Sequence, residues 1–172
     1  MKQGYVQVYT GQGKGKTTAA LGLAMRVAGA GYNVFIGQFV KGQKYSELNS
    51  FSLISDQITI RQYGTTSFIY NGPSQHDIQL AKNGLCEIQQ VLLAGQHKLV
   101  IMDEANIATF LGLFDVQDLI DIINIRPDHV ELVITGRYAD RQILELADLV
   151  TEMREVKHYY NVGVTARCGI EN

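Results

Sequence analysis

The sequence predicts a single α/β domain, spanning residues 1–172, in which helices cover both faces of a mostly parallel sheet. Short apolar runs alternate with longer segments whose apolar residues recur at helical spacing, which is the pattern of consecutive βα units. The runs at 33–40 and 99–102 are almost entirely apolar, as strands are when both faces of their sheet are covered. A chain of 172 residues is also long enough to bury a core of its own.

A glycine-rich loop stands between the first predicted strand and the first predicted helix. Residues 5–9 alternate as a short strand, residues 10–18 read TGQGKGKTT, and Leu21, Met25 and Ala28 then recur at helical spacing. In such a loop, backbone N–H groups converge on an anion and the helix N-terminus adds the positive end of its dipole. The order of strand, loop and helix therefore predicts a phosphate-binding P-loop in a P-loop NTPase-like (RecA-like) three-layer fold.

Within this loop, we expect Lys16 to reach the outer phosphates of a nucleotide and the Thr17 hydroxyl to hold a Mg²⁺ ion. The loop departs from the strict G-x-x-x-x-G-K-[ST] pattern, because Thr10 stands where the first glycine would be. The alternative is a plain glycine-rich turn with a surface lysine pair. The nucleotide-binding residues that we predict in the loop are Gly11, Gln12, Gly13, Lys14, Gly15, Lys16, Thr17 and Thr18.

The second chemical landmark is the acidic pair Asp103–Glu104, which ends the apolar run 99–102. P-loop enzymes use a carboxylate at the end of a strand to hold the metal or to orient water. We expect Asp103 near the metal and Glu104 near the nucleotide or the second substrate. The alternative is that one of the two carboxylates only caps the next helix. The predicted metal ligands, for Mg²⁺ or Mn²⁺, are Thr17, Asp103 and Glu104.

The remaining elements follow in order along the chain. Further strands are expected at 58–63, 129–135 and 149–156, and further helices from a Ser74 cap to about 94, at 116–124 and at 140–147. Gly84 counts against an unbroken second helix. Residues 157–172 show no regular period and receive no assignment.

Three segments lie where strands end, which is where open α/β sheets bind ligands. After the strand at 33–40, either Gln38 or Lys41 faces the ligand or the segment is an ordinary solvated turn. The turn-rich segment 64–73 carries three large apolar side chains, so it either folds over the core or covers an apolar ligand. Arg137, directly after a strand, either binds phosphate through its guanidinium group or forms a surface salt bridge.

Composition argues against several classes of protein. The net charge is −2 and no basic run occurs, which argues against a nucleic-acid partner. No stretch approaches the roughly 20 apolar residues of a membrane span, and residues 1–4 leave no room for a signal peptide before the first strand. Cys86 and Cys168 make neither a disulfide framework nor a metal motif, so we expect reduced thiols in a cytoplasmic protein.

Taken together, the motifs of this chain resemble one family. These are TGQGKGKTTAALGLAMRVAGAGYNV, QFVKG, VIMDEAN, VITGR, LADLVTEMREVKH and GVTARCGIE, in this order from about residue 4 to residue 171. The set is similar to the P-loop class of ATP:corrinoid adenosyltransferases, whose loop has the same shorter form that places Thr10 here.

The resemblance implies transfer of the 5′-deoxyadenosyl group of ATP to the Co(I) centre of a corrinoid such as cobalamin or cobinamide, with release of triphosphate. Co(I) is itself the nucleophile, so no general base is required. Lys14, Lys16 and the glycine N–H groups would stabilise the leaving triphosphate, with Mg²⁺ or Mn²⁺. The resemblance places Arg26 near the nucleotide, Glu104 near the ribose and Arg137 near the phosphates.

The resemblance also gives the segment 64–73 a role. In this family an aromatic pair displaces the lower axial ligand of the corrinoid, and Phe68 and Tyr70 match its positions. Tyr70 stands where well-known members have tryptophan, and this chain has none. The implied catalytic residues are therefore Lys16, Glu104, Phe68 and Tyr70. A reduced flavoprotein as electron donor and a homodimer are also implied. The alternatives are a P-loop phosphotransferase or ATPase acting on a small molecule, and a non-catalytic nucleotide-binding protein.

Overall fold

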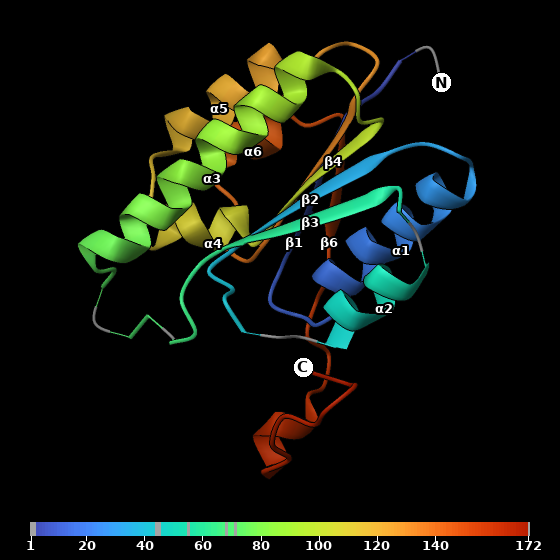
Figure 1. The fold of residues 1–172 in the computed structure, drawn as a ribbon. Coiled ribbons are helices and arrows are strands. Elements are labelled where there is room, and N and C mark those ends of the chain that lie inside the picture. The colour runs from blue at the N-terminus through green and yellow to red at the C-terminus, as the bar shows by residue number, and fades with distance from the viewer. Residues whose placement is uncertain (1–2, 44–45, 55, 68, 71, 172) are drawn as a thin grey trace.

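The computed structural model describes residues 3–43, 46–54, 56–67, 69–70 and 72–171 (Figure 1). Helices and strands alternate through most of the chain. The elements are β1 (Val6–Thr10), α1 (Lys16–Gly29), β2 (Val34–Phe39), α2 (Ser46–Ile54), β3 (Ile58–Tyr63), α3 (Gln75–Ala94), β4 (Leu99–Asp103), α4 (Ala105–Phe110), α5 (Val116–Ile125), β5 (Glu131–Thr135), α6 (Arg141–Leu146), β6 (Leu149–Glu152) and a 3₁₀ turn (Tyr159–Val162).

The six strands form one sheet in the order β3-β2-β4-β5-β1-β6, and every pairing is parallel. The predicted α/β class with a mostly parallel sheet is therefore confirmed. Because all strands run the same way, their carboxyl ends meet at one edge of the sheet. The order also makes β4, β5 and β1 consecutive neighbours, so the loops that follow these three strands lie side by side.

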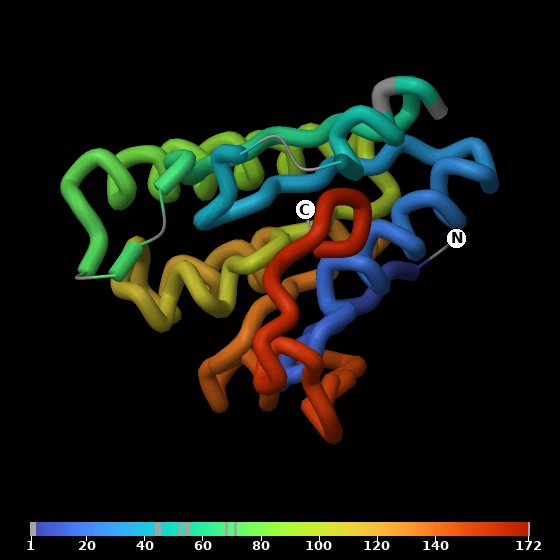
Figure 2. Tube along the Cα trace, turned by 90° about the horizontal axis from the view of Figure 1, so that it is seen from below, coloured from blue at the N-terminus to red at the C-terminus, as the bar shows by residue number. Residues whose placement is uncertain are grey.

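Helices cover both faces of the sheet, with α1 and α2 on one face and α3, α5 and α6 on the other (Figures 1 and 2). Alternate residues of β4 show how one strand serves two cores. Leu99 and Ile101 pack in the core beneath α1 and α2. Val100 and Met102 pack in the core beneath α3, α5 and α6. The nearly continuous apolar pattern of the central strands follows from this burial on both sides.

The long helix α3 is continuous, although Gly84 lies in its middle. A Cβ atom at this position would come within 2.5 Å of Cγ of Tyr63, so the glycine gives the Tyr63 ring room to pack against the helix. The helix begins at the predicted cap: the Ser74 hydroxyl accepts a hydrogen bond from the Asp77 N–H, and the Asp77 carboxylate accepts one from the Ser74 N–H.

The sequence pattern did not predict α2 or α4, and it extended β6 beyond its actual end at Glu152. α4 has only six residues, too few to show a helical period, and it begins immediately after β4. All four residues of β6 are exposed, since it is an edge strand, so its length is not marked by a buried face.

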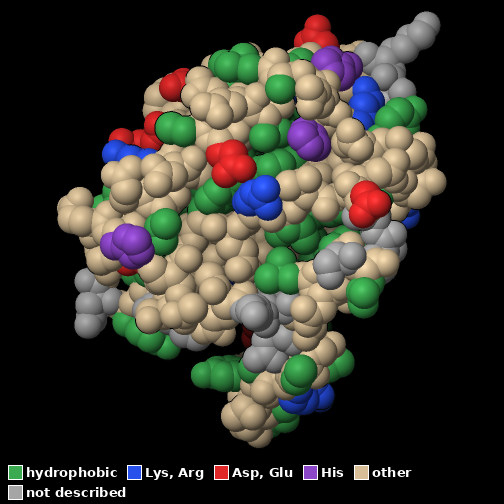
Figure 3. All heavy atoms as spheres, in the orientation of Figure 1, with side chains coloured by type: hydrophobic (Ala, Val, Ile, Leu, Met, Phe, Trp, Pro, Cys, Tyr) green, Lys and Arg blue, Asp and Glu red, His purple; other side chains and the backbone are tan. Residues whose placement is uncertain are grey.

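On the face shown in Figure 3, acidic and basic side chains are interspersed among the described residues. Among those residues, no helix is both long and apolar enough to cross a membrane.

Candidate active site

A cavity of about 760 Å³ lies at the carboxyl edge of the sheet, where the glycine-rich loop joins β1 to α1. Its size is in the range of sites for small ligands. Five separate parts of the chain contribute to its wall: the glycine-rich loop with the start of α1, Lys41 with residues of α2, the segment after β4, the segment after β5, and the C-terminal segment. The lining residues are Gly13, Lys14, Gly15, Lys16, Thr17, Thr18, Leu21, Lys41, Ser46, Glu47, Ser50, Glu104, Ile107, Arg137, Gly169, Ile170 and Glu171.

The loop has the strained conformation that its glycines permit. Gly11 and Gly15 have φ angles of 96° and 109°, in the left-handed region. A Cβ at Gly11 would also lie 2.4 Å from the carbonyl oxygen of Met153, and the Gly13 N–H donates a hydrogen bond of 2.7 Å to that oxygen. The segment after β6 therefore packs directly on the loop, and the Gly13 amide is already engaged by it.

Lys16 is buried at the start of α1 and turns back over the loop. Its Nζ donates hydrogen bonds of 2.7 Å to the carbonyl oxygens of Gly11 and Gly13. Burial lowers the pKa of Lys16, and the negative charge of Glu104 partly opposes that effect. The positive charge of Lys16 thus contacts neutral carbonyl groups rather than a carboxylate. Such a charge favours the binding of an anionic ligand.

Asp103 accepts four hydrogen bonds and is fully buried. Oδ1 accepts hydrogen bonds from the hydroxyls of Thr17, at 2.9 Å, and Thr135, at 2.7 Å. Oδ2 accepts hydrogen bonds from Nε2 of Gln38, at 3.2 Å, and from Nζ of Lys41, at 2.8 Å. These partners come from the start of α1, from β5 and from the end of β2, so the carboxylate at the end of β4 links the start of α1 to two neighbouring strand ends.

The oxygen atoms of Thr17 and Asp103 are suitable ligands for a magnesium ion. A hydroxyl and a carboxylate are oxygen ligands, which Mg²⁺ prefers, and it commonly combines a few protein oxygens with substrate phosphates. The Lys41 ammonium is a cation that already contacts both side chains: it lies 3.3 Å from the Thr17 hydroxyl and 2.8 Å from the Asp103 carboxylate. Among the described residues, no cluster of three or more His, Cys, Asp or Glu side chains forms a cage for a metal. An ion here would depend on the phosphates for its remaining ligands.

Glu104 lies at the N-cap position of α4 with a φ angle of 60°, but its side chain makes no capping hydrogen bond. The alternative that one carboxylate only caps the helix is therefore wrong for this residue. Burial raises the pKa of Glu104, and the adjacent charge of Asp103 raises it further. The left-handed backbone turns the side chain into the wall of the cavity.

The structure brings most of the predicted nucleotide residues to one place. Lys14, Lys16, Thr17, Thr18 and Arg137 all line the cavity, together with Gly13, Gly15 and Glu104. Arg137 makes no ion pair with any described residue, so the salt-bridge alternative has no support among them.

Other predicted residues lie away from the cavity wall. Gly11 and Gln12 do not line it. Arg26 is exposed near the end of α1, about 15 Å of helix rise from Lys16.

The aromatic segment after β3 lies at the same edge of the sheet but at a distance from the loop. Four strand spacings separate β3 from β1, or roughly 19 Å. Tyr70 is 84% exposed and lines a second hollow, of about 270 Å³, whereas Ile69 packs against the core. The core alternative thus applies to Ile69, and the alternative that the segment covers an apolar ligand stays a prediction. Phe68 lies outside the described residues.

Sequence reasoning missed several residues of the site. Thr135 holds Asp103, and nothing in its local pattern indicates this contact. Gln38, which the sequence named only as a candidate to face the ligand, is buried and donates a hydrogen bond to Asp103. Phe110 and Tyr138 stack with ring centroids 4.2 Å apart, and both are exposed beside the cavity residues Ile107 and Arg137.

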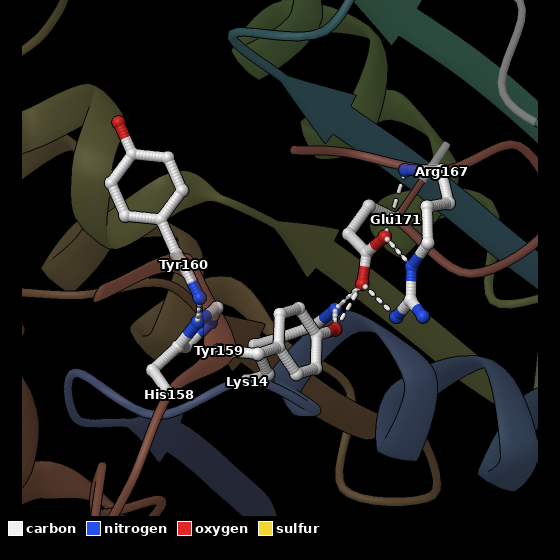
Figure 4. A network of polar contacts seen from close by, with 6 residues as sticks. All are labelled: Lys14, His158, Tyr159, Tyr160, Arg167 and Glu171. Atoms are coloured by element: carbon white, nitrogen blue, oxygen red, sulfur yellow. Dashed lines mark hydrogen bonds and ion pairs between the residues drawn. The ribbon is translucent and has the colours of Figure 1, made fainter. Parts of the chain in front are cut away.

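The sequence also gave no indication that the C-terminal segment belongs to the site, although Gly169, Ile170 and Glu171 line the cavity. The Lys14 ammonium donates hydrogen bonds to the Tyr159 hydroxyl, at 2.7 Å, and to Glu171, at 2.5 Å (Figure 4). An aromatic residue and an acid in an aperiodic segment carry no signal that would connect them to a lysine so far away in the chain.

Comparisons with known proteins agree with one another. Residues 2–172 match the family described as ATP:corrinoid adenosyltransferase BtuR/CobO/CobP. The corrinoid adenosyltransferase CobA of Salmonella typhimurium is 35% identical over 99% of this chain and 86% of its own length. The corrinoid adenosyltransferase of Escherichia coli K12 is 34% identical with the same coverage, and that of Pseudomonas aeruginosa is 33% identical over 99% of this chain and 84% of its own.

Proposed function

This chain belongs to the ATP:corrinoid adenosyltransferase family, and we propose that it transfers the 5′-deoxyadenosyl group of ATP to the Co(I) centre of a corrinoid. In the reaction, an electron pair of Co(I) forms the cobalt–carbon bond to C5′ of the nucleotide. The bond between C5′ and the ester oxygen breaks, and the electron pair of this broken bond leaves with the triphosphate. The enzyme must therefore bind two substrates at one edge and stabilise a highly charged leaving group.

The observation that carries this proposal is the convergence of cationic side chains on one cavity at the P-loop. Lys14, Lys16, Lys41 and Arg137 all line it, and they come from three different strand ends. Positioned charges that face a developing anion stabilise the transition state, and removing one such group typically costs 10²–10³ in rate, on the order of 3–4 kcal/mol. No side chain has to accept a proton, because the nucleophile is the cobalt itself.

We assign Thr17, Asp103 and Glu104 to a Mg²⁺ or Mn²⁺ ion that binds with ATP. When bound, such an ion neutralises phosphate charge and orients the triphosphate. Thr135 and Gln38 hold the Asp103 carboxylate in place by hydrogen bonds of 2.7 and 3.2 Å, so its position is set before the nucleotide arrives. Lys41 neutralises that carboxylate in the absence of the ion.

We place the corrinoid at the carboxyl edge, between the nucleotide cavity and the segment after β3. Two features support this placement. Tyr70 presents an exposed aromatic ring at that segment, and the stacked rings of Phe110 and Tyr138 stand exposed beside the cavity. A corrin ring is broad and largely apolar, and exposed aromatic side chains suit such a surface. Phe68 and Tyr70 would displace the lower axial ligand, as the family resemblance implies.

The family resemblance also implies an electron donor, an oligomeric state and a cellular compartment for this enzyme. We propose that a reduced flavoprotein supplies the electron that forms Co(I), that the enzyme acts as a homodimer, and that it works in the cytoplasm. The exposed, free thiols of Cys86 and Cys168 are compatible with a reducing compartment.

The decisive experiment is anaerobic incubation of the protein with ATP, Mg²⁺ and chemically generated cob(I)alamin. We expect a light-sensitive adenosylcobalamin spectrum and one triphosphate for each corrinoid converted. Lys16→Ala should abolish both signals while the protein stays folded. Release of phosphate without a cobalt–carbon product would instead identify a P-loop phosphotransferase or ATPase.

A further inference from the structure

The C-terminal segment, residues 153–171, forms one wall of the nucleotide cavity. It leaves β6, crosses the P-loop at Met153 and returns to the cavity at Gly169, Ile170 and Glu171. Figure 2 shows this segment, in red, lying against the start of α1. The wall is therefore built from the far end of the chain.

Glu171 is the centre of a compact polar cluster (Figure 4). Its carboxylate accepts hydrogen bonds from the Arg167 N–H, at 2.8 Å, from the Arg167 guanidinium, at 3.2 and 3.3 Å, and from the Tyr159 hydroxyl. The Arg167 guanidinium also lies over the Tyr159 ring, 4.8 Å from its centroid. These partners hold a carboxylate at the cavity wall, and only 16% of its side chain is exposed.

The remaining partner of Glu171 is Lys14 of the P-loop. The Lys14 ammonium lies 2.5 Å from Oε1 of Glu171, and it is also 5.3 Å from the centroid of the Tyr159 ring. Lys14 is one of the cations assigned above to the triphosphate. In the structure, the negative charge that Lys14 meets is that of Glu171.

A carboxylate and a triphosphate cannot both satisfy this ammonium without lying close to each other. Like charges in one small site repel, and the repulsion is stronger in a partly buried cavity than in water. Hydrogen bonds from Arg167 and Lys14 hold the pKa of Glu171 well below its usual range, so it is fully ionised at neutral pH. Binding of ATP must therefore break the contact between Lys14 and Glu171 or be weakened by it.

We propose that Glu171 competes with the triphosphate group for Lys14, and so sets how tightly the site holds ATP and the triphosphate product. The inference rests on the assignment of this cavity to the nucleotide. When the triphosphate binds, Lys14 transfers its contact from the carboxylate to the phosphates, and the C-terminal segment loosens. When triphosphate leaves, Glu171 takes Lys14 back, which favours product release.

The test is a double-mutant cycle read by calorimetric binding of ATP and of inorganic triphosphate, each with Mg²⁺. We expect Glu171→Gln to bind both ligands about fivefold more tightly than the wild type. In a Lys14→Met background the same substitution should have less effect, because the competed cation is gone. Glu145→Gln is the matched control: it removes an exposed ion pair with Arg141 on α6, outside the cavity, and should leave both affinities unchanged.

A second measurement uses the unaltered chain. Bound triphosphate should speed hydrogen exchange in the peptide that covers residues 158–171, since Lys14 no longer holds this segment through Tyr159 and Glu171. Equal or weaker binding by Glu171→Gln, or slower exchange in this peptide, would overturn the proposal, because the segment would then hold the ligand. A failure of the site assignment looks different: ATP would bind the wild type and Lys16→Ala equally well.

Discussion

The ammonium nitrogen of Lys41 lies 2.8 Å from Oδ2 of Asp103, so a lysine that follows β2 neutralises the buried carboxylate that ends β4. Only 13% of the Lys41 side chain and 1% of the Asp103 side chain are exposed. Although burial lowers the pKa of Lys41, the charge of Asp103 raises it overall, and the lysine stays protonated. The pair is thus a true buried ion pair at the predicted metal position.

We expect Lys41→Met to lower the free energy of unfolding by about 3 kcal/mol in the absence of divalent cations, because it leaves a buried carboxylate without its counter-charge. Mg²⁺ should then restore more stability than it adds to the wild type, since its binding stabilises the folded state by mass action. Urea unfolding with and without Mg²⁺ measures both effects. Lys82→Met, at an exposed position of α3, is the control. Equal stability of the two variants would show that the ion pair of Lys41 and Asp103 contributes nothing to the free energy of unfolding.

The aromatic segment after β3 should matter for one form of the substrate only. We expect Phe68→Ala and Tyr70→Ala to slow adenosylation of cob(II)alamin with reductant by on the order of tenfold or more. ATP affinity and the rate with preformed cob(I)alamin should change little, because the segment would act on the axial ligand rather than on the nucleotide. Parallel assays with the two cobalt states provide the comparison. Unchanged rates with cob(II)alamin would remove the role assigned to both residues.

Gly84 should tolerate no side chain even though alanine is the better helix former. Gly84→Ala places a Cβ 2.5 Å from Cγ of the buried Tyr63, and we expect a loss of about 1–3 kcal/mol from overpacking. Gly22→Ala in α1 is the matched control, because nothing lies within 4 Å of its Cβ. There the substitution should add about 0.5–1 kcal/mol. Thermal or urea unfolding of both variants decides the matter, and a stabilised Gly84→Ala would contradict the packing described here.

The capping box of α3 should give stability a defined pH dependence. Hydrogen bonds from Ser74 lower the pKa of Asp77 below its ordinary value. A lowered pKa in the folded state means that the ionised group stabilises the fold above the ordinary pKa, and that this stability is lost as the pH falls through the folded value. We expect Asp77→Asn to be less stable than the wild type at pH 7, by up to about 1 kcal/mol for an exposed cap. The difference should shrink below pH 4, and one that grew on acidification would contradict the assignment.

Several features of this protein could be predicted from local pattern alone. The glycine-rich loop between β1 and α1, the Asp103–Glu104 pair at the end of β4 and the Ser74 cap each depend on residues close together in the chain, and each lies where the sequence predicted it. The strands were located because burial on both sheet faces requires almost unbroken apolar runs. α4 was missed because six residues contain less than two helical turns.

The cavity itself depends on contacts that no local pattern contains. Thr135 meets Asp103 only because β5 pairs with β4, and Lys41 meets it only because β2 lies on the other side of β4. The order of strands in a sheet is decided by the packing of the whole chain, whereas periodicity reports only which face of an element is buried.

The sequence by itself determined the family of this protein and the local features of its site: a glycine-rich loop between a strand and a helix, an acidic pair after a buried strand, and a set of motifs that places the chain in one family. Tertiary structure decided which charged side chains face one another in the cavity. Lys14 meets Glu171, 157 positions along the chain, and Lys41 meets Asp103, 62 positions along. Such pairs form because distant strand ends and the C-terminal segment converge on one edge of the sheet, and that convergence is a property of the folded chain as a whole.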